Sequence, residues 1–437
     1  MVATVAQVTL WGRSLGALAV QPDGSIAFEY EPDWLNTGIE ISPLKLPAKP
    51  GIFRFPNLNP DTYKGLPGAF ADTLPDDFGN AVINAWLARQ GIPSEDFATL
   101  DRLLYTGNRG IGALEYHPAQ ELPDGETADI QVESLLHVAQ QILDQRANLD
   151  VDLNNNEALR SILQVGTSAG GARPKAVVAV NSDRSQIRSG QLSAPEGFTH
   201  YLLKFDGVVE HRTDKQTFGD PQGFGRMEYA YYRMATDAGI TMEPSELLEE
   251  DERAHFFTRR FDRQGNHKRH YQSLCAIAHA DYKRPGHYSY EELFTTARQL
   301  RLSRKEAIEL YRRMVFNVVA RNHDDHTKNI GFLLDDADAR WRLAPAFDIA
   351  YSYKPGSDWV DSHQLSLNGK RDHFTRDDLL AAASQISEFE AGAKRVIEQV
   401  CDTVAEWPTY AREAGVPSAL SDEIHRNLRL ISVEENF

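Results

Sequence analysis

A dense polar stretch, RNHDDHTKNIGF (residues 321–332), follows directly on an apolar helical pattern. The preceding segment 303–320 opens on a serine, a residue type that caps helices, and apolar residues recur along one of its faces. After the polar stretch, IGFLL and WRLAPAFDIA predict two short strands around the turn DDADA, so that the chain returns with Asp348. Asp324, Asn329 and Asp348 are therefore expected to lie together at the end of a buried helix.

The order and spacing of these three side chains are typical of phosphoryl transfer. Asp324, four residues and then Asn329 reproduce the D-x-x-x-x-N pattern of a protein-kinase catalytic loop. In that loop the aspartate takes the hydroxyl proton and the asparagine holds magnesium. Asp348 on the following element would supply a second oxygen ligand for the same ion. The pattern predicts a kinase that depends on ATP and Mg²⁺.

The same stretch is compatible with two other functions. His323 and His326 are three residues apart, and Asp324 and Asp325 would add oxygen ligands, as in an HD-type phosphohydrolase or a zinc site. The sequence has no second histidine or carboxylate motif at a recognisable spacing. A metal-dependent phosphohydrolase built on His323, Asp324 and His326 is one alternative, and a catalytically silent kinase fold that serves as a binding or co-repressor module is the other.

A glycine-rich segment upstream predicts a phosphate-binding loop. In VGTSAGGARPK (residues 165–175), glycines let backbone N–H groups approach an anion. The segment departs from the Walker pattern, because Ala172 and Arg173 follow the glycines in place of Lys and Ser or Thr. The predicted nucleotide-binding residues here are Gly170, Gly171, Ala172 and Lys175.

A lysine and a glutamate further along extend the kinase pattern. Lys204 lies in the predicted strand YLLKFD, where a kinase places the lysine that contacts nucleotide phosphates, and Glu228 in the next helix is its candidate ion-pair partner. Alone, a strand lysine is more often solvent-facing and a helical glutamate more often solvates a helix face. The order of all these motifs therefore carries the prediction, rather than any one of them.

Composition limits the classes of partner and compartment. The 437 residues suggest two or three domains, and their 41% apolar content is ample for sizeable cores. With 46 basic and 63 acidic residues the net charge is −17, so the whole chain is not an electrostatic match for DNA or an anionic membrane. Two cysteines favour a reducing, cytoplasmic setting. No signal-peptide pattern opens the chain and no apolar run approaches the roughly 20 residues of a membrane span, so no membrane association is expected.

Local patterns divide the chain into three parts. Residues 1–120 predict a small α+β module, with strands in VTLWGRSLGALAV and GSIAFEYEPDWL and a helix in PDDFGNAVINAWLARQGI. Residues 121–262 predict a lobe with the glycine-rich loop and the strands KAVVAV, HYLLKFD and AHFFTRRFD. Residues 263–437 predict a mostly helical lobe that carries the catalytic loop.

These residues, taken in order, resemble the HipA-type serine/threonine kinases, the toxin components of type II toxin–antitoxin pairs. The resemblance rests on SAGGARPKA, YLLKFD, RRFDR, NHDDHTKN and LAPAFDIA, and on LWGRSLGALAV and GNRGIGALEY near the N-terminus. It covers nearly the whole chain. It implies an α+β, bilobal protein-kinase-like fold with an extra N-terminal α+β subdomain and a mostly helical C-terminal lobe.

The resemblance also implies roles for single residues. Asp324 is the expected catalytic base, and Asn329 and Asp348 are the expected magnesium ligands. Ser168 is similar in position to the serine that family members autophosphorylate. A phosphate there would add roughly −1.5 to −2 charge and compete with ATP phosphates. The remaining expected roles are phosphate contact by Lys204, lining of the adenine site by Phe261, orientation by His326 and charge neutralisation by Lys328.

One position departs from the family pattern. Loops of the family often carry a glycine after the catalytic aspartate, whereas Asp325 stands here. A shifted register would make Asp325 the base. The four-residue gap to Asn329 favours Asp324.

The resemblance implies partners as well. They are a dimeric, helix-turn-helix HipB-like antitoxin, operator DNA reached through the antitoxin complex, and a translation-related protein substrate such as an aminoacyl-tRNA synthetase. An acidic kinase suits a basic DNA-binding partner. The basic segments RRFDRQGNHKRH and RQLRLSRKEAIELYRR could touch nucleic acid or substrate, but such runs are more often solvated faces.

Overall fold

The computed structural model describes residues 3–119, 132–145, 162–163, 166, 173–191, 193–209 and 219–431. The chain forms two compact units. The first contains residues 1–41, 46–225 and 246–271, and the second contains 42–45, 226–245 and 272–437. Within the described residues, no helix is both long and apolar enough to cross a bilayer.

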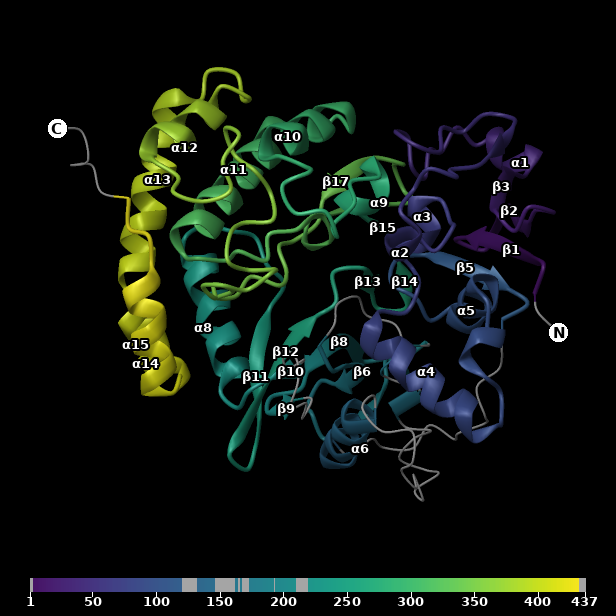
Figure 1. Ribbon diagram of the computed structural model, residues 1–437, viewed down its shortest axis with the longest axis horizontal. Coiled ribbons are helices and arrows are strands. Elements are labelled where there is room, and N and C mark those ends of the chain that lie inside the picture. Colours follow the sequence, from purple (N-terminus) through teal and green to yellow (C-terminus); the bar gives the residue numbers. More distant parts are fainter. Residues whose placement is uncertain are drawn as a thin grey trace. The chain divides into compact units, whose positions relative to one another are not determined.

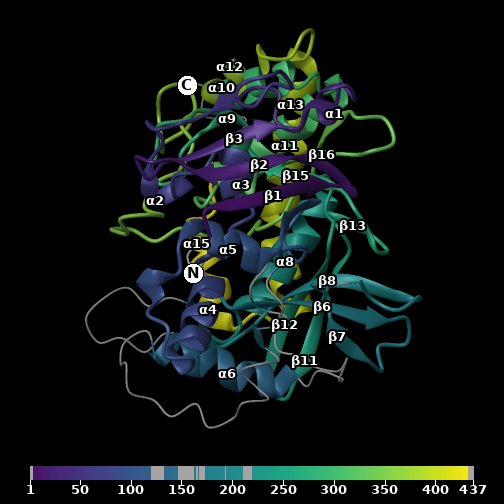
Figure 2. The same cartoon turned by 90° about the vertical axis from the view of Figure 1, so that its right-hand side faces the viewer.

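The first unit begins with an antiparallel sheet of strand order β4-β3-β2-β1-β5 (Figure 1). Figure 2 shows β1, β2 and β3 running side by side. The strands of this sheet are β1 (Val5–Leu10), β2 (Arg13–Val20), β3 (Ile26–Tyr30), β4 (Ile52–Phe53) and β5 (Leu114–His117). The helices nearby in sequence are α1 (Pro32–Leu35), α2 (Pro60–Tyr63), α3 (Gly68–Ala71), α4 (Asp77–Arg89) and α5 (Thr99–Thr106), with a 3₁₀ turn at Ser94–Asp96.

A second sheet in this unit has the strand order β11-β12-β8-β6-β7. Its members are β6 (Lys175–Asn181), β7 (Ile187–Ser189), β8 (Phe198–Lys204), β11 (Ser245–Glu250) and β12 (Arg253–Arg259). Short ribbons pair β9 (Val208–Val209) with β10 (Gly219–Asp220) and β13 (Arg263–Gln264) with β14 (His267–Lys268).

Helices α4 and α6 (Val132–Gln145) cover one face of this second sheet. Alternate residues of β6 share one buried cluster with the apolar faces of both helices, as strand and helix periodicity require. The members from β6 and β8 are Ala176, Val178, Val180 and Leu203, and those from α4 and α6 include Phe78, Val82, Ile83, Leu135 and Ile142. Segments on both sides of residue 120 therefore contribute to one core, and the predicted three-part division stays a prediction.

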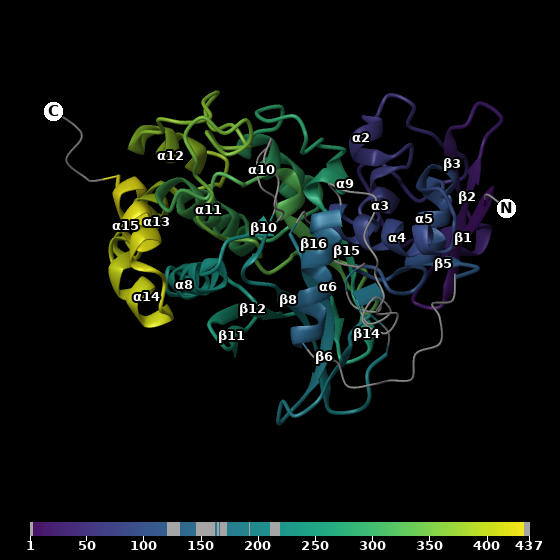
Figure 3. The same ribbon diagram turned by 60° about the horizontal axis from the view of Figure 1, so that its bottom comes forward.

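The second unit is mostly helical. Figure 3 shows α11 between α8, α10 and the helices of the C-terminus, and α11 packs against α13. Its helices are α8 (Phe224–Asp237), α9 (Leu274–Ala278), α10 (Tyr290–Gln299), α11 (Arg304–Val319), α12 (Arg376–Ala383), α13 (Glu390–Ala405), α14 (Trp407–Ala414) and α15 (Ser418–Asn427). A small sheet orders β15 (His270–Ser273), β16 (Gly331–Leu334) and β17 (Trp341–Leu343).

Two predicted strands are shorter than expected. The second N-terminal strand ends at Tyr30, because Pro32 starts the helix α1 at a position where proline is favoured. The predicted strand at 341–350 ends at Leu343, since Pro345 has no N–H to donate to a ladder. Asp348 then has a left-handed backbone, with φ 53°, so its side chain lies on an irregular segment and not on a strand.

Helix α11 begins as the sequence predicts. The Ser303 hydroxyl accepts from the N–H of Glu306, and the Glu306 carboxylate accepts from the N–H of Ser303. The same carboxylate also accepts from the N–H of Leu343 in β17, at 2.8 Å. The cap therefore ties the start of α11 to the hairpin that follows the predicted catalytic loop.

Removal of this cap has a measurable expected effect. We expect Ser303→Ala to lower the free energy of unfolding by about 1 kcal/mol, because the half-buried N–H of Glu306 loses its acceptor. Urea denaturation measures the change. Ser94→Ala, at an exposed serine, is the control and is expected to change it by less than about 0.5 kcal/mol. An equal loss in both variants would contradict the cap's role.

Candidate active site

The loop that carries the predicted base is held to the end of α11 by hydrogen bonds. Arg321 takes a left-handed backbone, with φ 57°, and the N–H of Asn322 donates to the carbonyl of Asn317 at 3.0 Å. The Asn322 amide also donates to the Asn317 side-chain oxygen at 2.9 Å. Further along, the Thr327 hydroxyl donates to the carbonyl of Ala280 at 2.6 Å. The chain thus turns sharply after α11, and these hydrogen bonds hold the loop that carries Asp324 in place.

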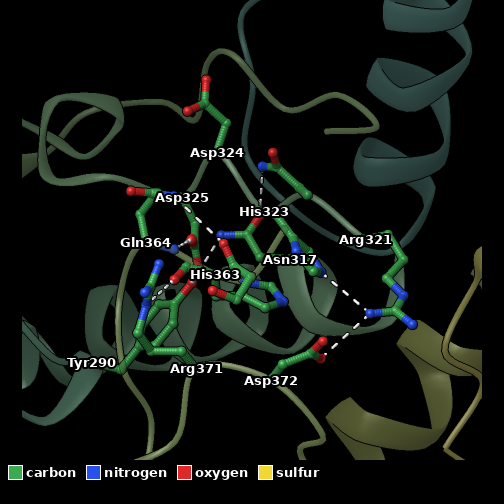
Figure 4. Close-up of polar contacts among 12 residues, drawn as sticks. Tyr290, Asn317, Arg321, His323, Asp324, Asp325, His363, Gln364, Arg371 and Asp372 are labelled. Carbon is green, nitrogen blue, oxygen red and sulfur yellow. Dashed lines mark hydrogen bonds and ion pairs between the residues drawn. The ribbon is translucent and has the colours of Figure 1, made fainter. Parts of the chain in front are cut away.

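Asp324 is the half-exposed carboxylate of this loop. Its side chain is 32% exposed and, in Figure 4, stands away from the cluster formed by His323, Asp325 and His363. The Asn329 amide donates to the backbone carbonyl of Asp324 at 2.9 Å, which fixes the loop beneath it. A partly solvated carboxylate on a braced loop is suited to accept a proton from an incoming hydroxyl.

Asp325 is buried in the protein interior and hydrogen-bonded there. Its side chain is fully buried and accepts from the Tyr290 hydroxyl at 2.6 Å, from His363 Nδ1 at 2.8 Å and from the N–H of Gln364 at 2.7 Å. Burial alone would raise the pKa of this carboxyl, but the His363 imidazole and the three hydrogen bonds hold the pKa below its ordinary value. Asp325 is therefore an ionised structural anchor, and its position gives no support to the shifted register.

His323 is also part of this interior. Its ring lies 4.1 Å from the ring of His363 and 4.9 Å from that of Tyr353, and the side chain is fully buried. Burial lowers the pKa of His323 to about 3, and the neighbouring His363 adds to the effect. The ring is therefore neutral at physiological pH.

Because His323 is buried and neutral, we predict that the second unit loses stability in acid. The unfolded chain binds a proton on residue 323 near pH 6.5, whereas folded His323 resists it down to about 3, so stability falls as pH falls through that window. We expect His323→Phe, which keeps a stacked ring, to flatten the slope of unfolding free energy against pH between these values. His425→Gln, at an exposed position in α15, is the control. An unchanged slope in the His323 variant would contradict the assignment.

Asn329 and Asp348 line one cavity of the second unit that has both polar and apolar walls. Its lining includes both of these residues together with Tyr290, Arg313, Asn317, Asn322 and Asp325. Carboxylate and amide oxygens are the donors that Mg²⁺ prefers, and Mg²⁺ commonly uses one or two protein ligands beside phosphate oxygens. The donor set of this cavity therefore fits the predicted ion.

The three residues of the alternative phosphohydrolase do not all meet at one point. His323 is buried against His363, while His326 Nε2 lies 3.7 Å from Asp324 Oδ1. Across the described residues there is no group of three His, Cys, Asp or Glu side chains placed to hold a metal ion. The geometry gives this alternative no support.

Two lysines of the predicted nucleotide site are buried in the first unit. Lys175 and Lys204 lie directly opposite each other in the β6–β8 register. The Lys175 ammonium lies 3.2 Å from Asp76, the N-cap of α4, and the Lys204 ammonium lies 5.6 Å from the centre of the Phe256 ring. Burial raises the pKa of Asp76 to about 6 although Lys175 opposes the shift. The sequence did not predict the contact of Asp76 with Lys175, because a helix-cap pattern does not indicate a partner 99 residues away.

The remaining residues of the predicted nucleotide site lie in several segments. Phe261 contacts Tyr271, with ring centres 5.5 Å apart. Glu228 is buried in α8, in the second unit, and its pairing with Lys204 stays a prediction. Ser168, Gly170, Gly171 and Ala172, which the sequence places in the predicted glycine-rich loop, lie outside the described residues.

The basic segment RRFDR forms a buried ion cluster. Asp262 accepts from Arg260 and Arg263, with closest distances of 2.7 Å, and from the N–H of Gly112 at 2.8 Å. Burial would raise the pKa of Asp262, but the two guanidiniums hold it far below its ordinary value. These arginines bind within the fold, so they are not a free surface for nucleic acid.

The second basic segment is similarly engaged. Arg304 donates to the carbonyls of Ser387 and Glu388, and Arg313 donates to the carbonyl of Ala344 at 3.0 Å. These contacts join α11 to neighbouring segments of the second unit. The structural interpretation of both basic segments is favoured.

Family comparison agrees with this geometry. Residues 6–117 match the HipA N-terminal domain, and residues 167–407 match the HipA-like C-terminal domain, which alone covers more than half of the chain. The chain belongs to the HipA family. As a HipA member it is a kinase of the toxin class, which confirms the resemblance seen in the sequence.

Two relatives of this HipA chain illustrate the match. One is "Putative kinase Y4mE" of Sinorhizobium fredii, 25% identical over 374 residues, with 79% of this chain and 77% of that protein covered. The other is a chain in the complex of the Shewanella oneidensis MR-1 toxin–antitoxin system that contains HipA, HipB and operator DNA. That chain aligns with a TM-score of 0.64 and 16% identity, covering 96% of this chain and 95% of that one. The predicted α+β, kinase-like fold is confirmed.

Proposed function

We propose that this HipA member is a serine/threonine protein kinase that uses ATP and Mg²⁺ and acts as the toxin of a toxin–antitoxin pair. The observation that carries the proposal is the arrangement in the second unit. A half-exposed carboxylate, Asp324, stands on a braced loop, and Asn329 and Asp348 present oxygen donors to one cavity.

Each residue has a distinct part in the proposed reaction. Asp324 accepts the proton of the substrate hydroxyl, and Asn329 and Asp348 hold Mg²⁺, which neutralises charge on the ATP phosphates when bound. His326 lies beside Asp324 and orients the loop. The Lys328 ammonium lies 5.0 Å from the centre of the Tyr282 ring and is placed on the same loop to neutralise charge on the transferred group.

Residues of the first unit, together with Glu228 of the second, are proposed to bind the nucleotide. Lys204 contacts its phosphates, and Lys175, already paired with Asp76, supports that contact across the β6–β8 register. Gly170, Gly171 and Ala172 cradle the phosphates, Phe261 lines the adenine site, and Glu228 pairs with Lys204.

The proposed partners follow from the family and from charge. A HipB-like, helix-turn-helix antitoxin dimer would bind this chain and link it to operator DNA, as HipB and operator DNA accompany HipA in the Shewanella complex. The net charge of −17 suits a basic partner. The protein substrate is proposed to be translation-related, such as an aminoacyl-tRNA synthetase.

Self-phosphorylation on Ser168 is a separate part of the proposal with its own test. We expect incubation with ATP and Mg²⁺ to place one phosphate on the peptide that contains Ser168, detected by peptide mass spectrometry. Ser168→Ala is expected to lose that phosphate while still transferring phosphate to a protein substrate. A phosphate that persists on the same peptide in the Ser168 variant would assign the modification elsewhere.

A further inference from the structure

A loop of the second unit carries an indole to the proposed base. The segment 353–364 is held by its own hydrogen bonds. The Ser357 hydroxyl accepts from the N–H groups of Trp359 and Val360, each at 3.2 Å, and Asp361 accepts from the N–H of Gly356 at 2.8 Å. The Gln364 amide donates to the backbone carbonyl of Trp359. The loop that carries Trp359 is therefore held in a defined conformation by its own hydrogen bonds.

Asp325 fixes the far end of this loop. His363 Nδ1 and the N–H of Gln364 both meet the Asp325 carboxylate, and Figure 4 shows these side chains converging beneath Asp324. An ionised carboxylate only accepts hydrogen bonds, so His363 Nδ1 carries a proton in this contact. Asp325, the sequence neighbour of the proposed base, therefore anchors the loop whose indole contacts that base.

The indole meets the base directly. Trp359 Nε1 donates to Asp324 Oδ1 at 2.7 Å. The ring also lies 6.3 Å from the Tyr282 ring and 6.0 Å from the His326 ring, which are 5.3 Å from each other. These two aromatic neighbours limit the rotation of the indole.

Such a contact restricts the carboxylate to one orientation. Among the described residues, Oδ1 of Asp324 takes the indole bond, and no side chain or backbone group bonds Oδ2. A hydrogen bond to a charged acceptor is short, directional and about twice as strong as a neutral one. One oxygen is therefore engaged, and the other is left to accept a proton.

We propose that Trp359 is a positioning residue for phosphoryl transfer, because its N–H holds Oδ1 of Asp324 and so leaves Oδ2 to receive the proton of the substrate hydroxyl. This inference rests on the proposed kinase function. In the step, the substrate oxygen forms its bond to the γ-phosphorus, the bond from that phosphorus to the ADP oxygen breaks, and the hydroxyl proton passes to Oδ2. Trp359 makes no bond to substrate or nucleotide.

Trp359→Phe tests the proposal by removing the N–H and keeping an aromatic ring. We expect kcat to fall about tenfold, since the base is no longer held in one orientation. KM for ATP and the thermal midpoint are expected to stay within about twofold and a few degrees of the wild type. An unchanged or higher kcat in an active preparation would overturn the proposal.

Trp407→Phe is the matched control in the same unit. Its indole donates to the carbonyl of Ser421 at 3.0 Å and is fully buried, so this change also removes one indole donor. We expect a lower thermal midpoint and an unchanged kcat. A kcat that falls equally in both variants would show a general packing effect and would also overturn the positioning role.

A spectroscopic measurement separates this inference from the kinase proposal. The chain has six tryptophans, so the indole ¹⁵N–¹H resonance of Trp359 is identified as the one that Trp359→Phe removes. In the full chain without nucleotide, Asp324→Asn is expected to shift this resonance more than the other indole signals. If the wild type transferred no phosphate, the kinase proposal would fail, while the shift would still decide whether the indole holds Asp324. A resonance that does not move would overturn the contact.

Discussion

Asp324→Asn is expected to reduce phosphoryl transfer by about 10² to 10⁴-fold, the range that a general base contributes. The amide keeps the shape of the side chain but cannot accept the hydroxyl proton. The fold should persist, because the side chain is about one-third exposed and the indole N–H of Trp359 still finds an oxygen acceptor. Steady-state transfer to a protein substrate measures the change, together with the thermal midpoint.

Asp402→Asn, at an exposed position in α13, is the control for the loss of one surface carboxylate. We expect it to keep full activity. If Asp324→Asn retained activity within a few-fold of the wild type, the assignment of the base to this residue would be wrong. Transfer lost together with a large drop in the thermal midpoint would point to unfolding in place of lost chemistry.

Asp325→Ala is expected to lower the free energy of unfolding by about 3–5 kcal/mol, the usual range for breaking a buried charged network on one side. Three donors, from Tyr290, His363 and Gln364, would lose their common acceptor in a fully buried site. Urea denaturation near neutral pH measures the loss. Its size distinguishes this structural role from that of the neighbouring carboxylate Asp324.

The same variant has a pH signature. The pKa of folded Asp325 is lowered, so its contribution to stability is present above the ordinary carboxyl value of 3.8 and is lost as pH falls through the lower folded pKa. The difference between wild type and Asp325→Ala should therefore be largest near neutral pH and shrink below about pH 4. A difference that grows in acid would contradict the ionised state of this anchor.

Local patterns in the sequence predicted the frame of the site. The cap at Ser303, the apolar face of α11 and the D-x-x-x-x-N spacing act over a few residues, so each could be interpreted without tertiary contacts. The return of Asp348 was also predictable from the two short strands, although Pro345 ends the second one early. The ordered set of motifs led to the HipA family, which the family match confirms.

The contacts between distant segments could not be predicted. Trp359 lies 35 residues beyond Asp324 in a loop without periodicity, and nothing in its neighbourhood indicates that its indole reaches a carboxylate. The Asp76–Lys175 pair joins a helix cap to a strand start. Both depend on tertiary packing that local propensity does not encode. The spacing to Asn329 already favoured Asp324 as the base, but the opposite burial of Asp324 and Asp325 could not be predicted, since the two residues are adjacent and identical.

The most direct test of the central claim is intact-mass spectrometry of phosphate-free chain incubated with ATP and Mg²⁺, beside Asp324→Asn. The account predicts a gain of one or more phosphates on the wild type and none on the variant. The contradicting result is an unmodified wild type that also fails to transfer phosphate to any translation-related protein and does not bind ATP. Equal phosphate on both chains would keep a kinase but remove Asp324 as its base.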